Sequence, residues 1–151
     1  FCGKIDKMGR HIFQLSKEAR KGNQFMKTME ALQDYVAIAF DCAIDLAPYF
    51  ETPCRDALLA QPSNQPPLLR DRMCTTRDHQ LFITWKCECE SYNSCAVMLE
   101  GNCLKLFTVI MLQCSQSIKM KLEGTAGYEA AKTMSNCHWL LTSLKNILPP
   151  I

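Results

Sequence analysis

The chain has 151 residues, of which 48% are apolar and 21% are charged, so it is long and apolar enough to form one compact globular domain. This composition excludes a disordered or low-complexity chain. The net charge of +2 is too small to indicate nucleic-acid binding.

Two amphipathic helices are predicted at the start of the chain. Apolar residues within 3–21 recur at steps of three and four, and Gly22 ends this first helix. Asn23 is a suitable N-cap for the second helix, whose apolar stripe runs over 25–46 before Pro48 stops it. Because the junction between them is only two residues long, we expect the two helices to form an antiparallel hairpin.

The middle of the chain is predicted to be more irregular. Thr52 and Pro53 are typical of a helix start and predict a short helix to Ala60, after which the proline-rich stretch 61–67 predicts an exposed loop. Residues 73–90 are ambiguous, because apolar and polar residues alternate there as in a strand, whereas a short helix ending in a Cys-x-Cys turn fits equally well. We favour the helix followed by a turn.

Two further helices are predicted near the C-terminus. The first starts at Ser94 and continues to about Leu122, and the second has its apolar stripe over 130–148. Together the elements predict an all-α fold, a disulfide-stapled antiparallel bundle of about four long helices and one or two short ones. A cysteine-rich, proline-containing connection lies in its middle. We expect residues 1–151 to form a single secreted helical domain.

The ten cysteines are the most unusual feature of the sequence. They are Cys2, Cys42, Cys54, Cys74, Cys87, Cys89, Cys95, Cys103, Cys114 and Cys137. Disulfide bonds persist in oxidising compartments, so an even number of cysteines at this density predicts a disulfide framework and a secreted, extracellular location. Structural zinc would use paired Cys-x-x-Cys or Cys/His ligands, and the sequence contains no such pair. We therefore expect neither a metal nor a cofactor.

The pairing of the cysteines is only partly constrained. Cys103 and Cys114 are eleven residues apart, which places them on one face of the predicted helix, so they cannot bond to each other. Cys137, on the apolar face of the last helix, is a natural partner for one of the two. The full connectivity of the ten cysteines stays open.

One stretch of cysteines resembles a known pattern. The spacing Cys74-x12-Cys87-x-Cys89-x5-Cys95-x7-Cys103 is similar to the Cys-x-Cys core of the helical GDNF-receptor-alpha modules. The similarity covers about a fifth of the chain, and the crowded cysteines near the start of those modules are missing. We interpret it as convergence and transfer no residue roles.

Nothing in the sequence indicates an enzyme. A serine hydrolase of the Gly-x-Ser-x-Gly type is excluded by the absence of that motif. A His-based hydrolase acting on RNA would need His11 and His138 to meet beside a lysine, but His11 lies on a basic helix and His138 beside Cys137. We therefore expect a protein without catalytic activity.

The remaining hypotheses concern binding. The first is an extracellular ligand or effector that recognises a protein partner through a rigid helical surface. Its candidate contacts are the basic residues of the first helix, Lys4, Lys7, Arg10, Lys17, Arg20 and Lys21. The alternative is a carrier of an apolar small molecule or lipid, suggested by eight methionines and seven phenylalanines that could line a cavity. A venom-like membrane-active or channel-active protein is a third possibility.

No transmembrane segment is expected. The best apolar runs cover 35–44 and 104–112, and both are too short to cross a bilayer. They also contain the charged residues Asp41 and Lys105. The sequence gives no indication of oligomeric state.

Overall fold

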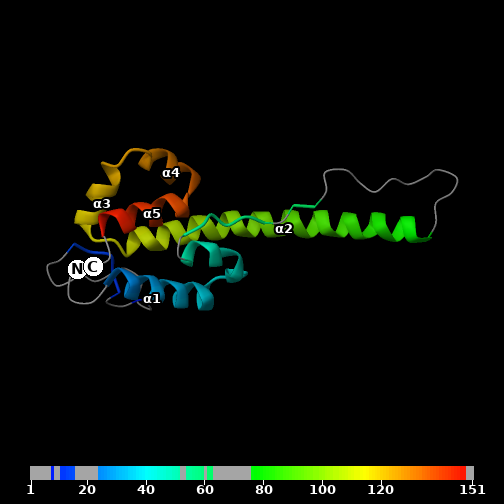
Figure 1. The fold of residues 1–151 in the computed structure, drawn as a ribbon, viewed down its shortest axis with the longest axis horizontal. Coiled ribbons are helices and arrows are strands. Elements are labelled where there is room, and N and C mark those ends of the chain that lie inside the picture. The colour runs from blue at the N-terminus through cyan, green and yellow to red at the C-terminus, as the bar shows by residue number, and fades with distance from the viewer. Residues whose placement is uncertain are drawn as a thin grey trace. The chain divides into compact units, whose positions relative to one another are not determined.

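The computed structural model describes residues 8, 11–15, 24–51, 54–59, 61–62 and 76–148 (Figure 1). Within these ranges the chain is helical, which confirms the predicted all-α class, and the extended backbone is limited to an isolated bridge. The elements are, in chain order, α1 (Gln24–Ala39), the 3-10 helix η3 (Ala43–Phe50), α2 (Thr76–Leu112), α3 (Gln116–Glu123), α4 (Tyr128–Met134) and α5 (Cys137–Ile147).

The chain divides into two compact units. Unit 1 comprises Phe1–Ala57 and Gly101–Ile151, and unit 2 comprises Leu58–Glu100. In unit 1, α1 and α5 both contact η3, and α3 and α4 pack on α5. The core of unit 1 is formed by the apolar faces of these helices and of the part of α2 beyond residue 100. Unit 2 contains the first part of α2, residues 76–100.

Residues 11–15 are not helical, and Phe13 in their middle is extended in a β-bridge, which corrects the prediction of a helix over 3–21 at these positions. Phe13 forms a parallel bridge with Cys114. Its N–H donates to the carbonyl of Gln113 at 2.9 Å, and its own carbonyl accepts from the N–H of Ser115 at 2.8 Å. A helix would satisfy these backbone groups locally, but here the partners come from a segment about one hundred residues further along the chain. The rest of the predicted helix, apart from Met8, lies outside the described residues.

The carbonyl of Ile12 anchors α1 to this extended segment. It accepts hydrogen bonds from Gln24 Nε2 at 3.2 Å and from the buried Thr28 Oγ1 at 3.3 Å. The predicted stripe of α1 is confirmed at Leu32 and Val36, which are both buried. The helix ends at Ala39, earlier than predicted.

The chain turns after α1 and continues as a different kind of helix. Cys42 adopts a left-handed conformation with φ of 54°, and η3 follows with Pro48 inside it. The side chain of Asn102 is buried and donates to the carbonyl of Asp41 at 2.7 Å, which ties the turn to α2. The short helix predicted for 52–60 is absent over 54–59, where the described backbone is irregular.

α2 is longer at its start and shorter at its end than predicted. It is continuous from Thr76, so the described part of the ambiguous stretch, residues 76–90, is helical without the expected turn, and Ser94 lies inside the helix rather than at its start. It ends at Leu112 because the backbone of residues 113–115 pairs with Phe13, so Cys114 lies beyond the helix that was expected to carry it. Ser115 is the N-cap position of α3.

The last predicted helix is two helices. Ser135 has a left-handed φ of 52° and ends α4, and the side chain of Asn136 then caps α5 by accepting from the N–H of Trp139 at 3.0 Å. The predicted stripe is confirmed at Leu141 and Leu144 of α5. It is wrong in α4, where the break shifts the register and leaves Met134 at the surface.

Candidate functional site

The eight described cysteines differ in their exposure. Cys42 and Cys87 are exposed, Cys54, Cys89, Cys95 and Cys103 are partly buried, and Cys114 and Cys137 are buried. No disulfide bond joins cysteines within the described ranges. Cys2 and Cys74 lie outside these ranges, so the disulfide framework as a whole stays a prediction.

Two of these cysteines meet in the core of unit 1. Cys137 is the first residue of α5, and its side chain is 0% exposed. Its Sγ donates to the carbonyl of Cys103 on α2 at 3.2 Å. Of the two partners expected for Cys137, the structure brings Cys103 to it, and Cys114 lies instead at the bridge with Phe13.

A chain of polar groups continues from Cys103 into η3. The hydroxyl of Tyr49 donates to Asp56 Oδ1 at 2.8 Å and lies 3.5 Å from Cys103 Sγ. Either the Tyr49 hydroxyl or the Cys103 thiol can donate in this second contact. The chain of polar contacts therefore links Cys103 through Tyr49 to a carboxylate.

The pKa values of the cluster favour neutral thiols. The hydrogen bond with the Cys103 side chain, followed by burial, raises the pKa of Cys137 well above its ordinary value. Burial and then the hydrogen bonds with Cys103 and Asp56 raise the pKa of Tyr49. Burial is also the main cause of the raised pKa of Cys54, which Asp56 raises further. All three groups are therefore protonated at neutral pH.

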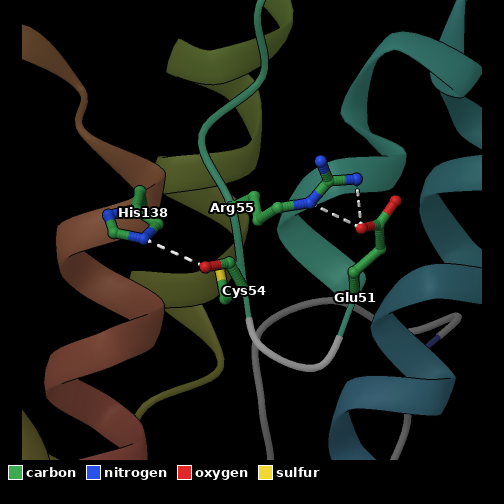
Figure 2. A network of polar contacts seen from close by, with 4 residues as sticks. All are labelled: Glu51, Cys54, Arg55 and His138. Carbon is green, nitrogen blue, oxygen red and sulfur yellow. Dashed lines mark hydrogen bonds and ion pairs between the residues drawn. The ribbon is translucent and has the colours of Figure 1, made fainter.

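His138 connects α5 to the segment that contains Cys54 (Figure 2). Its Nε2 donates to the carbonyl of Cys54 at 3.1 Å. Nearby, Arg55 Nε donates to the carboxylate of Glu51 at 2.8 Å, and the Arg55 Nη2 also contacts this carboxylate (Figure 2). His138 therefore has a structural contact with the backbone. In the described ranges, no group of three His, Cys, Asp or Glu side chains is arranged to hold a metal ion.

A second candidate site lies on the part of α2 that belongs to unit 2. Between residues 76 and 100 no side chain of this helix is buried. Apart from Asp78 and Cys95, the partly buried residues of this range follow steps of three and four along one face, which we call the α2 seam. The seam consists of Phe82, Trp85, Cys89, Tyr92, Ala96 and Leu99.

The spacing of the α2 seam is that of a helix-pairing surface. Its steps of four and three alternate as in the a and d positions of a heptad repeat, and they continue along the chain to Cys103, Leu106 and Ile110. The rings of Phe82 and Trp85 lie 5.9 Å apart. Sequence reasoning missed the seam because apolar and polar residues alternate around Cys87 as in a strand. The helical period becomes clear only when a longer window is considered.

The structure does not test the partner contacts that the sequence predicts for the basic first helix. Lys4, Lys7, Arg10, Lys17, Arg20 and Lys21 all lie outside the described residues. They stay a prediction.

By length and composition, α2 is the one helix in the described part of the chain that could cross a membrane. An 18-residue window of α2 has a mean hydropathy of 1.6, and 28% of it is buried. No such segment was expected from the sequence. The buried residues of α2 lie toward its end, where Leu106, Phe107 and Ile110 belong to the core of unit 1.

Comparisons of the chain with protein-family models, with curated proteins and with solved structures find no match.

Proposed function

We propose that this chain is an extracellular, non-enzymatic binding protein that recognises a protein partner through the α2 seam. The observation that carries the proposal is the contrast within α2. Leu106 and Ile110 are fully buried, whereas no side chain between residues 76 and 100 is buried. The helix therefore has apolar residues at pairing positions that are only partly covered.

The seam contains the residue types that contribute most to protein interfaces. Phe82, Trp85 and Tyr92 are aromatic, and Trp and Tyr are the residues most enriched at interface hot spots. Fully burying an aromatic or aliphatic side chain stabilises a complex by about 1.5 to 3 kcal/mol relative to leaving it exposed. A residue that is already partly buried contributes less than this. Several such residues on one face still supply a substantial driving force for association.

Charged residues beside the seam favour a particular kind of partner. Lys86, Glu88 and Glu100 are exposed and occupy the flanking e and g positions of the heptad. In paired helices these positions select partners with opposite charges. We infer that the partner presents an apolar helical face flanked by two basic groups and one acidic group.

The extracellular location is supported by the cysteine content. Ten cysteines in 151 residues are typical of secreted domains, in which disulfide bonds add the stability that a modest core does not provide. The disulfide-stapled antiparallel bundle remains part of the proposal.

The carrier hypothesis has less support from the positions of the methionines. It depended on methionine side chains lining a cavity, but Met26, Met98, Met120 and Met134 are at the surface. For the membrane-active hypothesis, the core position of Leu106 and Ile110 favours packing over insertion. We therefore develop only the protein-partner function.

The proposal is tested by two matched double substitutions in the same helix. Phe82→Glu with Leu99→Glu places charges on the seam, whereas Ile83→Glu with Val97→Glu places them on positions of the other face that are 59% and 72% exposed. Tagged wild-type protein and both variants are incubated with extracellular fluid from the source tissue, and the bound proteins are quantified by mass spectrometry.

We expect the wild type and the control pair to retain the same partner. The seam pair should lose it, with an affinity at least roughly 30-fold weaker, as for the removal of a hot-spot contact. Circular dichroism checks that both variants keep their helix content. Equal capture by both variants, or no protein bound by the wild type above a tag-only control, would contradict the proposal.

A further inference from the structure

The polar and sulfur-containing groups of unit 1 converge on one place that the proposed binding function does not use. This place is the contact between the start of α5 and α2, where Cys137 Sγ lies 3.2 Å from the carbonyl oxygen of Cys103. The two residues are distant in sequence and come from different helices, and both carry thiols in the structure. A bond between their sulfur atoms would close a loop that contains α3 and α4.

We propose that Cys103 and Cys137 are a disulfide-forming pair that links α2 to α5 when the protein meets a disulfide oxidant. The geometry that carries this assignment is the contact of the two residues across the helix interface. The pair lies in unit 1, whereas the α2 seam lies in unit 2. The pair rests on the disulfide framework of the proposed function, but its failure would leave partner binding through the seam standing, and the reverse also holds.

The exchange reaction has a defined order because the two thiols differ in burial. Cys103 is partly exposed, so its thiolate attacks one sulfur of a small-molecule disulfide such as oxidised glutathione. This step forms a mixed disulfide and releases one glutathione thiolate. The thiolate of the buried Cys137 then attacks the Cys103 sulfur and displaces the second glutathione. The two protein thiols lose two electrons and two protons, and the oxidised glutathione is reduced to two thiols.

The hydrogen bonds of the pair change in this reaction. Cys103 Sγ lies 3.5 Å from the Tyr49 oxygen, and the thiol of Cys137 donates to the carbonyl of Cys103. Oxidation removes both thiol protons, and the Tyr49 hydroxyl keeps its own donation to Asp56. The cluster therefore accommodates the bond without leaving a buried donor unsatisfied.

The raised pKa of Cys137 predicts how the reaction depends on pH. Only the thiolate is a nucleophile, and the hydrogen bond with Cys103 and burial both disfavour the thiolate of Cys137. The oxidation should therefore be slow at neutral pH and faster in alkaline buffer.

The test compares the full-length wild-type chain with Cys103→Ser, Cys137→Ser and Cys114→Ser. Cys114 is the matched control, because it is as fully buried as Cys137 but lies at the bridge with Phe13. Each folded protein is equilibrated in a glutathione redox buffer and quenched with acid. Remaining thiols are alkylated, and the disulfide-linked peptides are identified by mass spectrometry without reduction.

We expect a peptide pair linked through Cys103 and Cys137 in the wild type and in Cys114→Ser. The Tm of the wild type should rise by roughly 10 °C on oxidation, and this rise should be absent in Cys103→Ser. If Cys137→Ser fails to fold, the peptide map of the wild type and the partly exposed Cys103→Ser variant still decide the question. Full alkylation of Cys103 and Cys137 in the oxidised wild type, or a bond from either to another cysteine, would overturn the proposal.

Discussion

Replacing Leu106 by alanine should strongly destabilise unit 1. Leu106 is 0% exposed, so the substitution removes three buried carbon atoms and leaves a cavity between α2 and the surrounding core. Buried leucine-to-alanine substitutions cost about 2 to 5 kcal/mol of the free energy of unfolding. With a denaturant dependence of roughly 1 to 3 kcal/mol per molar urea, the unfolding midpoint should fall by roughly 1 to 2 M.

Leu104 provides the matched control on the same helix. It is two residues away and 57% exposed, so Leu104→Ala removes the same atoms from a mostly solvated position. Its cost should be well below that of Leu106→Ala, within about 1 kcal/mol. Urea unfolding followed by circular dichroism at 222 nm measures both variants. Equal destabilisation by the two would refute the position of this part of α2 in the core.

Four further predictions test local features of unit 1. Gly127→Ala should destabilise by about 1 to 3 kcal/mol, because Gly127 has a φ of 90° and an added Cβ would lie 3.2 Å from the indole nitrogen of Trp139. By contrast, Gly101→Ala, with nothing within 4 Å of the added Cβ inside a helix, should stabilise by about 1 kcal/mol in thermal unfolding. Asn102→Ala should cost about 1 to 3 kcal/mol, because it leaves a backbone carbonyl without its donor, and urea titration against the wild type measures this loss. Burial raises the pKa of Cys114 to about 12. The stability that the buried, protonated thiol contributes is therefore fully present below the unfolded-state pKa of roughly 9 and is lost as the pH rises toward 12. The slope of unfolding free energy against pH in this window should be shallower for Cys114→Ala, and an unchanged slope would contradict the assignment.

The sequence predicted features that depend on local spacing. The helical class and the buried stripes at Leu32 and Val36 of α1 and at Leu141 and Leu144 of α5 follow from the steps of three and four. These features need only neighbouring residues, so a single sequence contains the information.

Features that depend on distant residues were not predictable in this way. The non-helical conformation of residues 11–15 and the end of α2 at Leu112 have the same cause, the backbone pairing of Phe13 with Gln113 and Ser115. Amphipathic periodicity alone favoured helix on both sides of this contact. The break at Ser135 had a local signal, because Asn136 is a favourable N-cap, but the apolar stripe on both sides suggested one continuous helix.

The α2 seam was missed for a different reason. The alternation between residues 83 and 90 and the two close cysteines suggested a strand or a turn, although the same residues fit a heptad when the window is extended to Ile110. The helical period of the seam therefore becomes visible in the sequence only when the window extends to Ile110.

Amide hydrogen exchange along α2 tests the central claim most directly, first for the free protein and then with the partner captured by the wild type. In the free protein, we predict that amides of residues 76–100 exchange markedly faster than those of residues 102–110, because only the latter range contains buried side chains. Adding the partner should slow exchange between Phe82 and Leu99. Uniform protection along the whole of α2 in the free protein, or protection by the partner only outside these residues, would contradict the role of the seam.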